Sequence, residues 1–151
     1  MKSRYLFPFI ALIFILTMGI YFLVNPSYTK SIEAKYYYEM GEYKEAYSLA
    51  SEAFGLDVYN RMAATIMAQS KTSIKYVKYI TQAKEYLIEI QEIAQEEIIS
   101  DAQRAKIKLM SEIVVGSYVK LAPSVITNKE LVKEAAKYHN EFENLLEKVT
   151  E

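Results

Sequence analysis

The chain has 151 residues, and its 18 lysines and arginines nearly balance its 19 aspartates and glutamates, for a formal net charge of −1. This balance argues against a protein that binds nucleic acid through a strongly basic surface. The absence of cysteine excludes disulfides, thiolate metal sites, iron–sulfur clusters and thiol chemistry, and a single histidine excludes metal sites built from several imidazoles. The sequence therefore predicts architecture and location better than it predicts a chemical task.

The chain begins with its most apolar segment, residues 5–24, which contain no charged side chain. A helix of this length rises about 30 Å, the thickness of a hydrocarbon core. Pro8 falls in the first turn, where a missing N–H costs little, and Asn25-Pro26 ends the helix. A cleaved signal peptide would have a shorter apolar core, and a buried core helix seldom stays uncharged for so long. We predict an uncleaved anchor, residues 1–27, with a transmembrane helix at about 5–24.

The basic residues next to this segment predict its orientation. Lys2 and Arg4 precede it, and residues 1–30 contain no acid, so the N-terminus is expected in the cytoplasm. Residues 28–151 would then lie on the periplasmic or outer side of an inner (cytoplasmic) membrane.

Residues 28–151 are predicted to form one all-α domain of about six helices, because they contain only three glycines and one proline. Gly41 is expected to separate helices at 31–40 and 43–54. Gly55 is expected in the left-handed conformation after the second helix, with Asp57 as the next N-cap. A third helix is expected at about 58–70.

Apolar residues at steps of three or four define helices in the second half of the domain. The first spans about 73–99, with an apolar face at Val77, Ile80, Ala83, Leu87, Ile90 and Ala94. The next, opened by a capping box at Ser100 and Gln103 and ended by Pro123, has its face at Ala102, Ala105, Leu109, Ile113, Gly116 and Val119. The last follows a second capping box at Thr127 and Glu130, and its stripe is Leu131, Ala135, Tyr138, Phe142, Leu145 and Val149. These stripes predict a buried core; alternatively, residues 131–149 dock onto a partner helix or a second copy.

Residues 34–57, AKYYYEMGEYKEAYSLASEAFGLD, resemble a tetratricopeptide (TPR) repeat. The pattern consists of an early small residue, aromatics one turn later, a glycine turn, an aromatic and spaced alanines. Its members here are Ala34, Tyr37, Tyr38, Gly41, Tyr43, Ala46, Ala50 and Ala53. The resemblance covers about 24 residues, and Val58 stands where the family usually has proline. It implies antiparallel helical hairpins packed through the alanines, and protein binding through the concave face of the first helices.

Two groups of side chains are candidate partner-binding residues. The first is a tyrosine cluster, in which a polar tip and a large apolar ring suit a partly hydrated interface: Tyr36, Tyr37, Tyr38 and Tyr43, with Tyr47 beside them. The second is a lysine row, Lys71, Lys75 and Lys78, at spacings that share one helix face, flanked by Tyr76 and Tyr79. The row could contact anionic headgroups or an acidic partner, although an ordinary solvated face is the simpler interpretation.

No constellation of residues indicates catalysis, a cofactor or a metal site. His139 is expected to be a surface histidine, because nothing marks a nucleophile elbow and glycine is scarce. Glu92, Glu96 and Glu97, with Glu89 nearby, are expected to form a solvated acidic face, since side chains on consecutive turns of one helix lie in a row rather than around a cleft.

The leading functional hypothesis is a membrane-tethered helical-repeat adaptor that is not an enzyme and binds a protein partner in a cell-envelope assembly. The alternatives are a homo-oligomeric structural component of an envelope machine (a secretion, pilus or motor complex) and a periplasmic holdase-like chaperone.

Overall fold

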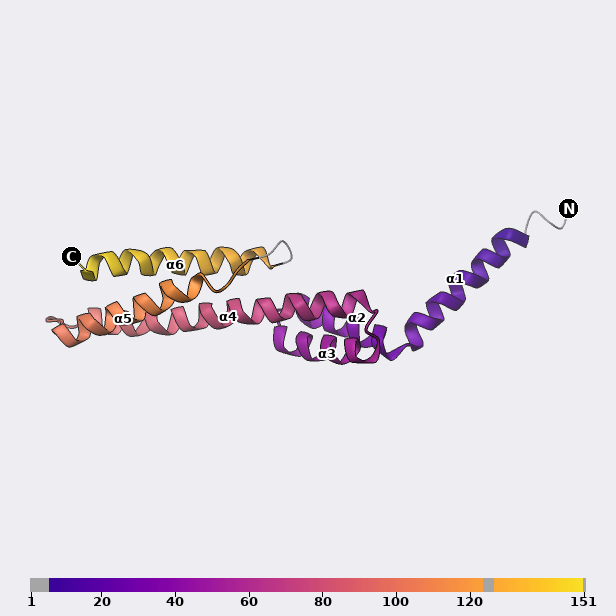
Figure 1. Cartoon of the computed structure of the whole chain (residues 1–151), viewed down its shortest axis with the longest axis horizontal. Helices are drawn as coiled ribbons and strands as arrows, with labels where there is room; N and C mark the ends of the chain where they lie inside the picture. The colour runs from indigo at the N-terminus through magenta and orange to yellow at the C-terminus, as the bar shows by residue number, and fades with distance from the viewer. Residues whose placement is uncertain (1–5, 124–126, 151) are drawn as a thin grey trace. The chain divides into compact units, whose positions relative to one another are not determined.

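The computed structural model describes residues 6–123 and 127–150, with only the backbone for Phe22 and Leu23. Within these residues there are six α-helices and no strand, which confirms the all-α class (Figure 1). In chain order the helices are α1 (Leu6–Val24), α2 (Pro26–Glu39), α3 (Tyr43–Leu56), α4 (Arg61–Ala94), α5 (Asp101–Tyr118) and α6 (Lys129–Thr150). The chain divides into two compact units, Met1–Lys71 and Thr72–Glu151, and α4 contributes residues to both.

A single residue, Asn25, ends α1 and starts α2. Its backbone N–H donates to the carbonyl of Tyr21 over 3.0 Å, which closes the last turn of α1. Its side-chain oxygen accepts from the backbone N–H of Ser27 over 3.0 Å, and Pro26 occupies the first turn of α2. Proline is well suited to that position because its missing N–H has no helical partner there. The prediction that the helix begins at residue 31 is therefore wrong, because residues 26–30 are already part of α2.

Helices α2 and α3 form a hairpin around Gly41, whose φ of +84° lies in the left-handed region. Ala34 on α2 and Ala46 and Ala50 on α3 have no solvent exposure, so the two backbones approach closely. Ile66 of α4 joins this alanine cluster, with Tyr37, Tyr38, Leu49 and Met67 at its margin.

Gly55 does not end α3 as expected. The helix continues to Leu56, and the backbone of Gly55 has no positive φ. Asp57 was predicted to be the N-cap of the next helix, but Asp57 and Asn60 each accept a backbone hydrogen bond in this connection. The Asp57 carboxylate accepts from the backbone N–H of Tyr59 over 2.9 Å, whereas the side-chain oxygen of Asn60 caps α4 by accepting from the N–H of Ala63 over 3.1 Å.

A buried polar network connects the start of α2, the end of α3 and the start of α4. The hydroxyl of Ser27 donates to the carbonyl of Ala53 over 2.8 Å. The side-chain amide of Asn60 donates to the hydroxyls of Ser27 and Ser31 over 2.9 and 3.1 Å. All three side chains are buried. Their hydrogen bonds therefore satisfy polar groups at a helix junction from which water is excluded.

Helix α4 is one continuous helix of 34 residues, so the predicted break near residues 71–72 is wrong. No glycine or proline occurs between Gly55 and Gly116 to interrupt the helix, and residues 71 and 72 lie within it. The domain predicted at six helices therefore contains five in the part of the chain that the structure describes.

The core of the second unit is built from α5, α6 and the later turns of α4, and it consists mostly of large side chains, with Ala83 and Ala135 among them. Phe142 of α6 has no exposure, and Tyr76 of α4 and Val114 of α5 are only 1% exposed. The predicted stripe of α6 lies in this core: Leu131, Ala135, Tyr138, Phe142, Leu145 and Val149 all belong to it. Self-association through residues 131–149 would have to compete with this packing.

The buried face of α5 is not the predicted one. Ile107, Met110 and Val114 face the core, whereas Leu109 is 56% exposed and Val119, just after the helix, is 80% exposed. Both sets have helical spacing, and the larger side chains bury more apolar area than a stripe containing Ala102, Ala105 and Gly116 would.

The ends of α5 and α6 show which capping signals the structure follows. The capping box at Ser100 and Gln103 is present in full, as predicted. Helix α5 ends at Tyr118, before Pro123 is reached. At α6 the side chain of Asn128 accepts from the N–H of Glu130 over 2.9 Å, so Asn128 takes the position predicted for Thr127.

Candidate functional site

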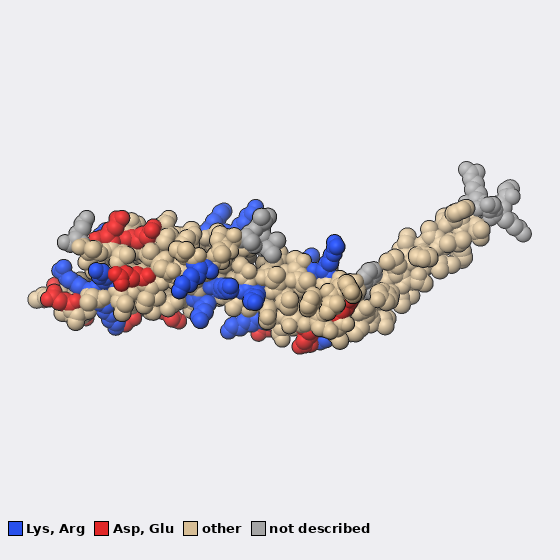
Figure 2. Space-filling model, in the orientation of Figure 1, with Lys and Arg blue, Asp and Glu red and all other residues tan. Residues whose placement is uncertain are grey.

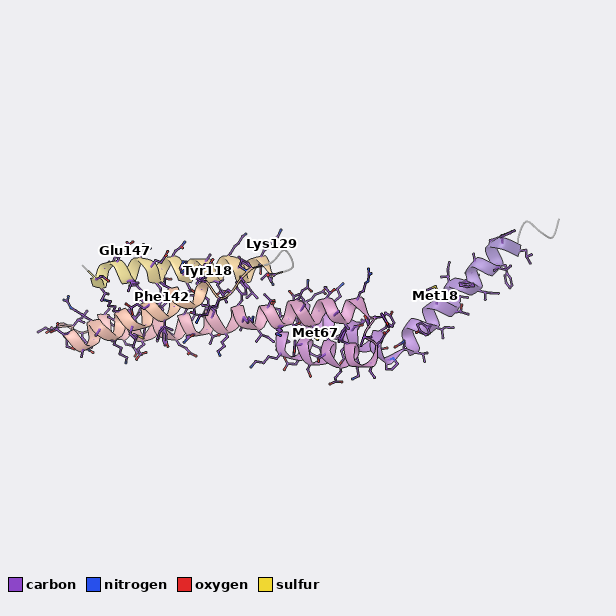
Figure 3. The ribbon with its side chains drawn as sticks, in the orientation of Figure 1. Met18, Met67, Tyr118, Lys129, Phe142 and Glu147 are labelled. Carbon is purple, nitrogen blue, oxygen red and sulfur yellow. The ribbon has the colours of Figure 1, made fainter. Side chains whose placement is uncertain are left out.

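Helix α1 presents apolar side chains to its surroundings on every side. Its described residues are all exposed; Phe7, Phe14 and Ile15 reach 80%, 68% and 69%. The sticks around Met18 in Figure 3 project outward from the ribbon, and the space-filling view in Figure 2 shows α1 without any acidic or basic colour. Its one hydroxyl before Tyr21, that of Thr17, is hydrogen-bonded to the carbonyls of Ile13 and Phe14 over 3.0 Å.

Among the described residues, no helix by itself has both the length and the apolar character of a membrane span. One bent pair, Leu6–Tyr21 with Pro26–Glu39, meets both criteria when its two helices are taken together, with 72° between them. The transmembrane helix expected at 5–24 stays a prediction, and Lys2, Arg4 and Tyr5 lie outside the described residues.

An open groove lies between α2 and the first turns of α4. Lys35, Tyr38 and Glu39 line it from α2, and Arg61, Met62, Thr65, Ile66 and Gln69 line it from α4. Its lining combines apolar side chains, such as Met62 and Ile66, with the charged side chains of Lys35, Glu39 and Arg61. Lys35 and Glu39 form an ion pair of 3.7 Å across one helical turn, whereas Arg61 has no ion pair among the described side chains. The groove can therefore accept an apolar side chain together with a carboxylate.

The predicted tyrosine cluster divides between packing and exposure. Tyr38 and Tyr43 make an edge-to-face contact across the Gly41 turn, with centroids 5.3 Å apart. Tyr36 and Tyr37 make a similar contact at 5.7 Å, but Tyr36 is 59% exposed. Tyr37, Tyr38, Tyr43 and Tyr47 are half-buried, so Tyr38 alone of the predicted residues both packs in the unit and lines the groove.

The residues of the lysine row, Lys71, Lys75 and Lys78, are all exposed on α4, as their spacing predicted. The expectation that Tyr76 and Tyr79 accompany them on the surface is wrong, because both rings are buried in the second unit. Burial raises the pKa of Tyr79 to about 12, with smaller contributions from Tyr118 and Glu143. The row is thus a set of lysines without aromatic partners, which weakens it as a headgroup or peptide site.

His139 is not a surface histidine. Its ring stacks on Tyr118 at a centroid distance of 4.1 Å, and its Nε2 lies 3.4 Å from a carboxylate oxygen of Glu143. The side chain is 18% exposed, and its Nδ1 is buried without a hydrogen-bond partner among the described atoms. The contact joins α5 to α6.

The expected acidic face does not lie on a single helix, because α4 ends at Ala94 and Glu96 and Glu97 follow it. The carboxylates make individual contacts instead. Glu89 pairs with Lys106, and Glu96 accepts from the side-chain amide of Gln103 over 2.7 Å. Glu92 and Glu97 are exposed. Within the described part of the chain, no three His, Asp or Glu side chains are grouped so that they could hold a metal ion.

Sequence reasoning missed most of the groove. Arg61, Met62 and Ile66 lie at the start of α4, in a segment for which the predicted N-cap was three residues too early. The signal that could have found them is the i, i+4 relation of Met62 to Ile66, which places an apolar pair next to the α2 hairpin.

Comparison with known proteins adds no identification: no protein-family model matches the chain, and no curated protein or solved structure shows significant similarity to it.

Proposed function

We propose that this protein is a membrane-anchored helical adaptor. In this proposal α1 is embedded in a bilayer, and the groove between α2 and α4 binds a segment of another protein in a cell-envelope assembly. The observation that carries the proposal is the continuous exposed apolar surface of α1, which carries no charge and which no other part of the described chain covers.

The anchor is supported by the cost of leaving such a surface in water. Soluble monomers rarely expose contiguous apolar patches of more than a few hundred Å². In α1 the side chains of residues 6–21 and of Val24 are all exposed, on every side of the helix. The polar groups of α1 suit a bilayer, since the Thr17 hydroxyl is bonded within the helix and the Tyr21 hydroxyl accepts from the side-chain amide of Asn25 over 3.2 Å. Lys2 and Arg4 favour a cytoplasmic N-terminus, so the helical units would lie on the periplasmic or outer side.

The adaptor role is supported by the elements that line the groove. Under the TPR interpretation, α2 is the first helix of one unit and the start of α4 is the first helix of the next. TPR proteins bind partners on the surface formed by such first helices. The residues of the groove come from α2 and α4 only, so the open surface is the one that the resemblance implies. Arg61, which has no ion pair with another described side chain, favours a partner segment with an acidic side chain or a terminal carboxylate next to an apolar anchor.

Site-specific photocrosslinking in intact membranes tests this proposal. A photoreactive amino acid at Met62, in the groove, is expected to capture a discrete partner. The same amino acid at Ser48, on the exposed side of α3, serves as the matched control and is expected to capture none. Arg61→Glu should reduce the product from position 62 about tenfold, the effect of losing one charge-assisted hydrogen-bonded pair. Equal products from positions 62 and 48, or none from either, would count against the groove.

A reporter fused after Glu151 that is active only outside the cytoplasm tests the orientation separately. Activity is expected, and a reporter that works only inside would reverse the placement.

A further inference from the structure

The first unit has a second exposed apolar surface, in the connection between α3 and α4. Leu56, Val58 and Tyr59 are 57%, 59% and 87% exposed, which is unusual for three apolar side chains in four successive residues. Within this segment the Asp57 carboxylate accepts from the backbone N–H of Tyr59 over 2.9 Å. We call residues 56–59, which are the last residue of α3 and the three residues after it, the α3–α4 loop.

The buried polar network determines where this loop lies. Ser27 is the third residue after the end of α1, and its hydroxyl bonds to the carbonyl of Ala53, one turn before the loop. Asn60, the residue directly after the loop, donates to the same hydroxyl over 2.9 Å. The loop is thus held on both sides against the residues at which the chain leaves α1.

The residues around the end of α1 also lie close to the α3–α4 loop. Leu56 and Asp57 line a depression together with Ile20, Tyr21 and Val24, the last apolar residues of the anchor. Its lining is mostly apolar and continues from the surface of α1 onto the loop. The α3–α4 loop is therefore continuous with the surface for which a bilayer is proposed.

We propose that the α3–α4 loop is a second bilayer contact, with Leu56, Val58 and Tyr59 inserted in the headgroup region next to the exit of α1. The inference rests on the proposed function, because it requires α1 to be in the bilayer. Tyrosine favours this region, where its ring is shielded and its hydroxyl stays hydrated, and the aliphatic side chains of Leu56 and Val58, which precede Tyr59, add apolar area.

Two contacts would fix the direction of the α2–α3 hairpin, which a single flexible anchor would leave free. The α2 helix has 14 residues and rises about 20 Å, so the Gly41 turn lies at the other end of the hairpin from the α3–α4 loop. Met40, which is 64% exposed next to that turn, is then the natural reference: it is as apolar and as exposed as the loop residues, but at the opposite end of the same hairpin.

Depth-dependent fluorescence quenching tests the proposal on the full chain, because a protein without cysteine accepts single labels cleanly. Single substitutions Tyr59→Cys, Val58→Cys, Met40→Cys and Phe14→Cys are each labelled with an environment-sensitive probe. The proteins are reconstituted in vesicles of phosphatidylethanolamine and phosphatidylglycerol that contain nitroxide lipids, shallow or deep. Shallow nitroxides should quench the probes at 58 and 59 about threefold more than the probe at 40, as expected for insertion at the headgroup boundary. Deep nitroxides should quench the probe at 14 most strongly.

The outcomes separate this inference from the anchor on which it rests. If the probe at 14 is quenched and those at 58 and 59 behave like the probe at 40, the loop contact is wrong and the anchor stands. If the probe at 14 is also unquenched, both the anchor and the loop contact are wrong. Probes at 58 and 59 that are shielded from aqueous iodide but unaffected by nitroxide lipids would indicate that protein covers the loop, which also overturns the proposal.

Discussion

The helices of the two units pack through different kinds of side chain. In the first unit the helices meet through alanines, and a network of Ser27, Ser31 and Asn60 joins their ends. In the second unit they meet through large side chains such as Phe142 and Tyr76. Because alanine buries little apolar area, the first unit depends more on close approach and hydrogen bonds, and the second on the hydrophobic effect.

Helices α1 and α6 repeat this contrast within single elements. They have similar lengths, 19 and 22 residues, but α6 carries its apolar residues in one stripe with charges on its other face. That stripe packs in the core of the second unit, whereas the described side chains of α1 are all exposed and none of them is charged. An apolar stripe can be buried against other helices of the same chain, whereas a helix that is apolar on all sides needs apolar surroundings from outside the chain.

The largest expected change in the free energy of unfolding comes from a substitution in the core of the second unit. Phe142→Ala should cost about 3–5 kcal/mol of unfolding free energy, because a fully buried ring leaves a cavity. Urea unfolding of the full chain in detergent micelles measures the change. The matched control, Leu109→Ala, removes a 56% exposed side chain on α5 and should change stability by about 0.5 kcal/mol or less. Comparable losses in the two variants would mean that the α5 face has been assigned wrongly.

The next effect is on the polar network of the first unit. Asn60→Ala removes the donors to Ser27 and Ser31 and the cap of α4, and should cost about 2 kcal/mol. Hydrogen exchange should rise in α2, α3 and the start of α4, but not in α5 or α6. Asn140→Ala, at an exposed position of α6, is the control and should leave exchange in the first unit unchanged. Unchanged exchange in Asn60→Ala would show that the alanine contacts are sufficient.

Two glycines of the first unit should respond with opposite signs. Gly41→Ala forces a side chain into φ +84° and should cost about 1 kcal/mol, whereas Gly55→Ala, inside α3, should stabilise by up to about 1 kcal/mol. A Cβ at either position would meet no neighbour within 4 Å, so the backbone alone determines the sign. Thermal unfolding of the two variants measures it, and a loss of stability in Gly55→Ala would contradict the helical conformation of that residue.

The smallest effect at neutral pH is expected for Tyr79→Phe, since the Tyr79 hydroxyl is buried without a partner among the described atoms. Alkaline pH should reveal its difference from wild type. Burial raises the pKa of Tyr79 from 10.0 to about 12, so the folded protein holds this proton more tightly than the unfolded chain does. Its contribution is complete below pH 10 and is lost as the pH rises from 10 to 12. Urea midpoints across this window should fall less steeply in Tyr79→Phe, and parallel curves would contradict the assigned burial.

The sequence predicted those features that a local pattern determines strongly. Gly41 and the alanines around it specify a hairpin because only small residues permit such close helices, and the capping box at Ser100 provides both of its own hydrogen bonds. The sequence predicted the α6 stripe because charged residues occupy the remaining faces of that helix. The groove was mostly missed, because it depends on two helices that are distant in sequence.

The errors occurred where two local signals competed. Helix α5 has apolar residues on two faces, and only the surrounding helices select Ile107 and Val114 over Leu109 and Ile113. Gly55 suggested a helix end, but the network around Ala53 and Asn60 places that end later. The stacking of His139 on Tyr118 joins residues of different helices, which periodicity alone does not reveal.

The most direct test of the account is whether α1 holds the full-length protein in a membrane. Membranes that contain the protein are washed with alkaline carbonate and floated through a density gradient. We predict that wild type stays with the lipid, and that the double variant Phe14→Arg, Ile15→Arg is released, because each arginine at the centre of a span costs about 2.5–3.5 kcal/mol. Wild-type protein that remains in the wash would contradict the anchor and, with it, the proposed adaptor.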